Sequence, residues 1–228
     1  MNQNNMRFKL LILLLTIISS SEKFFKYEEE DKTAILIITH TKSLNVLSEQ
    51  KQFFDELDII LDIINFDKIK SLIITTNSDE KFFKPDFNIS EIKNIFKQQA
   101  QELFIKGNNV LKKLESLPIP VISIIDGFSL GLGLELSLCC DIRICTEKSI
   151  FGLPETSLGF IPNFGSIQRL TKIIGISMAK YLIYTGYTIN AKEALRIGIV
   201  NGIYSQTELL NKAKNIAEKI YKNSHNLF

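Results

Sequence analysis

Histidine and cysteine are scarce in this chain of 228 residues, and their spacing excludes several kinds of site. The two histidines, His40 and His225, lie far apart and no Cys-x-x-Cys motif is present, which argues against zinc and leaves few bases for a serine or cysteine nucleophile. The cysteines are Cys139, Cys140 and Cys145. The adjacent pair cannot form an ordinary disulfide, and we expect all three to be small core residues. No metal site is therefore predicted.

A strong excess of one charge sign is also absent. The formal net charge is +2, with no arginine-rich stripe and no basic patch interleaved with aromatic residues. This excludes a typical nucleic-acid partner but is compatible with a small anionic ligand. Hydrophobic residues make up 45% of the chain and charged residues 23%, which is ordinary for a globular protein. The length suits one domain with a sizeable core.

The longest apolar run lies at the N-terminus. Residues 1–9 are polar and basic, residues 10–18 are continuously apolar, and three serines follow. This order is typical of a secretory signal, and an organelle-targeting leader is the alternative. The run is short for a membrane span, which needs about 20 apolar residues. We assign residues 1–30 to a leader and a solvated linker, expect no stable membrane insertion beyond the leader, and place the fold in residues 31–228.

Strand and helix patterns alternate through the rest of the chain, which predicts an α/β fold with mostly parallel strands. The β-rich segments predict strands at residues 34–39, 69–76, 121–125, 142–146 and 199–204. Apolar residues at helical spacing predict helices at residues 48–66, 92–117, 133–140, 168–174, 178–184, 191–197 and 207–221.

Two glutamates lie in mainly apolar segments that glycine and proline interrupt. Glu135 ends the run Gly127-Phe-Ser-Leu-Gly-Leu-Gly-Leu-Glu, and Glu155 ends Phe151-Gly-Leu-Pro-Glu. An ionised carboxylate is costly to bury unless it is paired or hydrogen-bonded. Either glutamate alone is more simply read as a solvated side chain, but the pair predicts a closed acid/base site.

The turn before Glu135 has the pattern of a strand, a glycine turn and a helix start. Unpaired backbone N–H groups at a helix start favour negative charge. The glycines do not fall as Gly-x-Gly-x-x-Gly, and no Gly-Lys-Ser/Thr follows, which excludes the dinucleotide and P-loop fingerprints. A site for a developing oxyanion and a tight turn with glycines for packing both remain open.

These motifs resemble those of the enoyl-CoA hydratase/isomerase (crotonase) family. The resemblance covers residues 33–222 and is densest from 118 to 200. It rests on Asp126-Gly127, Gly131-Leu132-Gly133 and Glu135, on Phe151-Gly152-Leu153-Pro154-Glu155, on Leu158-Gly159-Phe160-Ile161-Pro162, and on Gln168-Arg169-Leu170. It implies the ClpP/crotonase fold of repeated ββα units. Family members continue through further C-terminal helices, so the resemblance also implies a C-terminally short domain.

The resemblance implies a role for particular residues. A thioester carbonyl would lie between the N–H groups of Leu132 and Phe87, with the N–H of Asp86 as the alternative second donor. Phe164 and Ser166 occupy the family's Gly-rich stretch and are expected to narrow the pocket. The residues expected to contact the substrate are Lys42, Leu44, Asp86, Gly131, Gly133 and Pro162.

The implied activity is that of an enoyl-CoA hydratase, a lyase of fatty acid β-oxidation. Glu135 and Glu155 would hold a water that adds across the double bond of a 2-enoyl-CoA thioester. Coenzyme A is then part of the substrate and no separate cofactor is expected. An enoyl-CoA isomerase, which needs only Glu155, is the first alternative. The second is a non-catalytic CoA-binding partner subunit, suggested by the altered loop at Phe87 and the short C-terminus.

The resemblance also implies an assembly and a location. The resemblance implies a homotrimer or hexamer if the fold is complete, and acyl-CoA chemistry belongs in the mitochondrial matrix or the cytoplasm. The secretory-like leader points elsewhere, so the location stays open.

Overall fold

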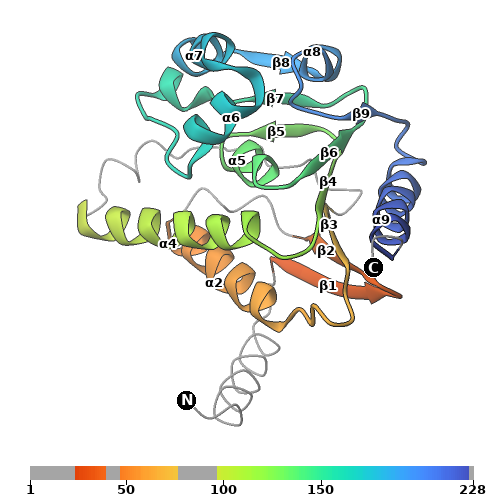
Figure 1. Ribbon diagram of the computed structural model, residues 1–228. Helices are drawn as coiled ribbons and strands as arrows, with labels where there is room; N and C mark the ends of the chain where they lie inside the picture. The colour runs from red at the N-terminus through yellow and green to blue at the C-terminus, as the bar shows by residue number, and fades with distance from the viewer. Residues whose placement is uncertain (1–23, 40–46, 77–96, 226–228) are drawn as a thin grey trace.

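The computed structural model describes residues 24–39, 47–76 and 97–225 (Figure 1). A six-stranded sheet has the order β1-β2-β3-β4-β6-β9. Its strands are β1 (Phe25–Glu30), β2 (Thr33–Ile38), β3 (Ser71–Thr76), β4 (Val121–Ile125), β6 (Ile142–Cys145) and β9 (Gly202–Ile203). Within this sheet the β1–β2 pair is antiparallel and the other described pairs are parallel, which confirms the predicted mostly parallel α/β fold.

Helices cover both faces of this sheet (Figure 1). On one face, α2 (Leu47–Ile63) and α4 (Lys97–Glu115) pack against inward side chains such as Leu36 and Leu72. On the other face, α9 (Leu209–His225) packs against Ile35 and Ile73. Neighbouring strand residues therefore enter different cores, as the two-residue period of a strand requires.

A second, smaller sheet carries the remaining helices. It consists of β5 (Phe128–Leu130), β7 (Ile150–Gly152) and β8 (Thr188–Asn190). Around it lie α5 (Leu132–Leu138), the 3-10 helix η1 (Pro154–Leu158), α6 (Ser166–Ile174), α7 (Ile176–Thr185) and α8 (Ala191–Arg196). This sheet was not predicted, because three-residue strands leave almost no periodic pattern.

The assignment of residues up to 30 to a solvated linker is wrong for its last six residues, which form β1. Phe25 and Tyr27 pack against the core, and the ring centroids of Phe25 and Phe53 lie 4.7 Å apart. The charged residues of this strand stay partly or fully exposed at the edge of the sheet. The strand was not predicted because four of its six residues are charged, and Phe25 and Tyr27 alone carry the alternating apolar pattern.

Two further observations complete the fold. All three cysteines are buried free thiols, which confirms their expected place in the core. Among the helices that the structure describes, none is long and apolar enough to cross a membrane.

Candidate active site

The parallel pairing of β5 with β7 brings the two glutamate motifs together. Leu130 pairs with Gly152, and α5 and η1 each begin two residues beyond that pair. The Gly131 N–H donates to the Gly152 carbonyl at 3.0 Å and continues the pairing into the turn. Glu135 lies on α5 and Glu155 on η1, so both carboxylates project from the same end of this strand pair.

The Glu135 side chain is buried, with 2% of its surface exposed. Its Oε1 accepts hydrogen bonds from the Phe164 N–H at 2.9 Å and from the Ser166 hydroxyl at 2.8 Å. Burial is the largest influence and raises the pKa of Glu135, whereas these two donors, the positive charge of Arg169 and the backbone N–H of Ser166 act to lower it. The site thus removes this carboxylate from water but supplies partners for its charged form.

The Glu155 side chain is also buried, with 6% of its surface exposed, and the backbone N–H of Glu155 itself is the hydrogen-bond donor that acts to lower its pKa. Its Oε2 has no hydrogen-bond partner among the described residues. Burial raises the pKa of Glu155 to about 8, and the negative charge of Glu135 adds to the rise. The neutral acid is therefore the stable form of Glu155 at neutral pH.

The expected oxyanion donor lies at the start of α5. Gly131 has φ 52 and ψ −123, and Leu132 is the first helical residue. The first N–H groups of a helix have no acceptor within that helix, so the Leu132 N–H is oriented away from the helix body. The Leu132 side chain is partly buried and packs against the core that contains residues of α2 and α4. The fold therefore accommodates a leucine at a position where the family carries a glycine.

The structure describes six of the ten expected site residues: Gly131, Leu132, Gly133, Glu135, Glu155 and Pro162. Gly131 and Gly133 are buried beside Leu132, and Pro162 is buried in the loop that leads to Phe164. The other four, Lys42, Leu44, Asp86 and Phe87, lie outside the described residues. The second oxyanion donor and the substrate contacts expected of Lys42 and Leu44 therefore stay predictions.

Sequence reasoning missed the residues that hold Glu135. Phe164 and Ser166 were expected to narrow the pocket. Instead, the Phe164 ring packs in the core, where its centroid lies 5.1 Å from that of the Phe54 ring. It is the backbone N–H of Phe164 that donates a hydrogen bond to Glu135. A serine within a stretch where the family is glycine-rich was the available signal for an added hydroxyl donor.

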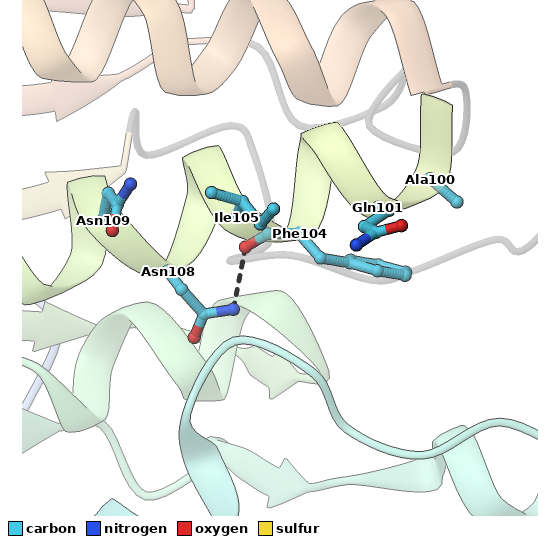
Figure 2. A pocket seen from close by; sticks show the side chains of 6 residues that line it. All are labelled: Ala100, Gln101, Phe104, Ile105, Asn108 and Asn109. Carbon is cyan, nitrogen blue, oxygen red and sulfur yellow. Dashed lines mark hydrogen bonds between the residues drawn. The ribbon is translucent and has the colours of Figure 1, made fainter. Parts of the chain in front are cut away.

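A pocket on α4 lies next to the loop that holds Glu135 (Figure 2). It is lined by Ala100, Gln101, Phe104, Ile105, Asn108 and Asn109. Asn108 Nδ2 donates to the Phe104 carbonyl at 2.8 Å and to the Asn163 carbonyl at 2.9 Å. The rings of Phe104 and Phe164 pack edge to face, with their centroids 5.7 Å apart. The pocket contains neither glutamate, but Asn108 and Phe104 connect its wall to residues 163–164.

The fold and the site define a class of protein: a mostly parallel α/β domain with paired buried carboxylates beside a glycine turn. Residues 29–228 match the model of the family described as enoyl-CoA hydratase/isomerase. The chain belongs to the enoyl-CoA hydratase/isomerase family, which confirms the resemblance inferred from the motifs.

Individual relatives agree with this assignment. The chain is 42% identical over 197 residues to a short-chain-enoyl-CoA hydratase of Clostridium acetobutylicum, a match that covers 86% of this chain and 75% of the relative. It is 40% identical over 193 residues to a crotonyl-CoA hydratase of Syntrophomonas wolfei, covering 85% and 74%. The crystal structure of an enoyl-CoA hydratase from Bacillus anthracis superposes with a TM-score of 0.76 at 32% identity, covering 87% of this chain and 77% of that one. These relatives are bacterial and give no support for a mitochondrial location.

Proposed function

We propose that this protein is an enoyl-CoA hydratase, a lyase that adds water across the double bond of a 2-enoyl-CoA thioester. The observation that carries the proposal is the pair of buried glutamates with opposite hydrogen-bond environments. Hydration needs one group to take a proton from water and another to give a proton to carbon, and the pair offers both. The names of the two relatives with 40–42% identity, a short-chain-enoyl-CoA hydratase and a crotonyl-CoA hydratase, support short-chain substrates such as crotonyl-CoA.

The two environments suggest which glutamate does what. Glu135 accepts two hydrogen bonds and lies near the charge of Arg169, so it is the better holder of negative charge. It would take a proton from the water as the water oxygen bonds to the β-carbon. Glu155, neutral at pH 7, would give its proton to the α-carbon. The thioester oxygen would hold the transient negative charge near the Leu132 N–H, with the Phe87 N–H as the predicted second donor.

The test is the hydration of crotonyl-CoA by the purified chain, followed as loss of the enoyl-thioester absorbance. Glu135→Gln should lower kcat by about 100- to 10,000-fold, the usual contribution of a general acid or base. Glu56→Gln is the matched control. Glu56 is a buried glutamate on α2 that accepts from the Phe24 N–H at 2.9 Å, outside the site. Its variant should keep the wild-type rate per folded molecule.

The other possible outcomes would each indicate a different function or mechanism for this chain. Undiminished hydration in folded Glu135→Gln would refute the two-glutamate mechanism. Conversion of a 3-enoyl-CoA to the 2-enoyl isomer that needs Glu155 but not Glu135 would identify an isomerase. Coenzyme A binding without any turnover would identify a non-catalytic partner subunit. Sedimentation would test the homotrimer or hexamer that the resemblance implies.

A further inference from the structure

The loop between η1 and α6 reaches back to α5 and places two donors on a single oxygen. Phe164 and Ser166 lie 29 and 31 residues after Glu135 in sequence, yet both donate to its Oε1. Ser166 is fully buried and is the first residue of α6. The N-cap position of α6 belongs to Gly165, and the Ser166 hydroxyl is directed to the Glu135 carboxylate.

We propose that Ser166 is a positioning residue for the hydration, whose hydroxyl fixes Glu135 as an oriented, ionised carboxylate. The inference rests on the proposed function and adds a residue to it. With Oε1 held by Ser166 and Phe164, the carboxyl group has one orientation about its final torsion angle. Oε2 is then the oxygen that takes the proton from water.

The loop that carries these donors is itself held by the neighbouring helices. Arg169 Nη1 donates to the Phe164 carbonyl at 2.7 Å, and its Nη2 bonds Glu115 Oε2 on α4 at 2.8 Å. Gly165 has φ +84, and a Cβ there would lie 2.4 Å from Arg169 Nη1. Asn108 of α4 binds the Asn163 carbonyl. The serine hydroxyl is therefore presented by a segment that has little freedom to move.

Charge makes the direction of the effect clear. A hydroxyl that donates to a carboxylate favours the ionised form, so removal of the Ser166 hydroxyl should raise the pKa of Glu135. The titratable or charged groups around Glu135 and its arginine neighbour are Glu155 of η1, Arg169 of α6, Glu115 of α4 and Cys139, the residue that follows α5. None of these is changed by a substitution at Ser166.

The first measurement is the pH profile of kcat/KM for crotonyl-CoA hydration. In Ser166→Ala and the similar-sized Ser166→Cys, the acid limb should move up by about one pH unit or more, the typical effect of a hydrogen bond to a charged group. At pH values on the acid side of that limb, kcat/KM of the variants should be about tenfold or more below that of wild type. Ser137→Ala is the matched control, because its equally buried hydroxyl donates to the Leu134 carbonyl and not to Glu135. An unshifted limb in both folded Ser166 variants would overturn the proposal.

The second measurement does not depend on turnover. Carboxyl ¹³C resonances of glutamate can be titrated by NMR, and Glu135→Gln identifies the Glu135 signal. Ser166→Ala should raise the pKa of that signal and Ser137→Ala should leave it in place. A shift in a protein without hydratase activity would refute the proposed function while the charge-setting role of Ser166 stands. Hydration with no shift in either measurement would refute the role of Ser166 alone.

Discussion

Replacement of Glu155 with glutamine should stabilise the protein at alkaline pH while it removes activity. The pKa of this carboxyl is raised from 4.5 to about 8 in the folded state, so folding holds a proton that the unfolded chain releases. Its contribution to stability is fully present below pH 4.5 and is lost as the pH rises through 8. At about 1.4 kcal/mol per pH unit, the loss reaches about 5 kcal/mol at pH 9. Glutamine is neutral throughout and avoids it.

The measurement is urea or thermal unfolding of wild type and Glu155→Gln between pH 5 and pH 9. The two proteins should differ by less than about 1 kcal/mol at pH 5, because this pH lies just above 4.5, where the loss begins. At pH 9 the variant should unfold roughly 10–20 °C higher, from about 2–4 °C per kcal/mol for a chain of this size. Glu193→Gln is the control. Arg196 lowers the pKa of this surface carboxyl, so it stays ionised across most of this range and its stability difference from wild type should stay constant above pH 6. Parallel stability curves for wild type and Glu155→Gln would refute the reasoning.

Two glycine substitutions test the packing around the same loop. Gly165→Ala should lower both stability and kcat, because φ is +84 and the new Cβ would meet Arg169 Nη1 at 2.4 Å. Gly175→Ala, at φ 79 and ψ 157 in open space, should lower the free energy of unfolding in urea by about 1–3 kcal/mol and leave kcat unchanged; an equal kcat loss in both variants would contradict this. Gly107→Ala should not gain the roughly 1 kcal/mol that helix propensity favours, because its Cβ would lie 2.4 Å from Phe164 Cε1. A full gain in urea unfolding would show that the ring moves aside freely.

Much of the main sheet could be predicted from the sequence, because its strands are buried runs separated by helices with a clear period. Residues 34–39 and 121–125 were such runs, and β2 and β4 match them closely. The strand β1 could not be predicted, since three consecutive glutamates dominate its composition. The strands β5, β7 and β8 are too short to carry a period, and only their pairing reveals that the two glutamate motifs share a sheet edge.

The same distinction applies to the site: residues in local motifs could be predicted, whereas contacts between distant segments could not. Glu135 and Glu155 were predicted because each lies in a local motif of apolar and turn residues. The hydrogen bonds from Phe164 and Ser166 could not be predicted in the same way. They depend on the left-handed backbone of Gly165 and on an arginine that a different helix holds in place. Sequence spacing carries no direct record of such a contact.

The difference between the two carboxylates therefore originates outside both glutamate motifs. The β5–β7 pair delivers Glu135 and Glu155 to the same end of the small sheet and buries both, which alone would raise both pKa values. Residues 163–169 then supply donors and a positive charge to Glu135, whereas Glu155 Oε2 receives no partner from the described residues. On this reasoning the division into base and acid depends on the loop that follows Pro162. Variants of that loop should change the protonation of the pair without any change to either glutamate.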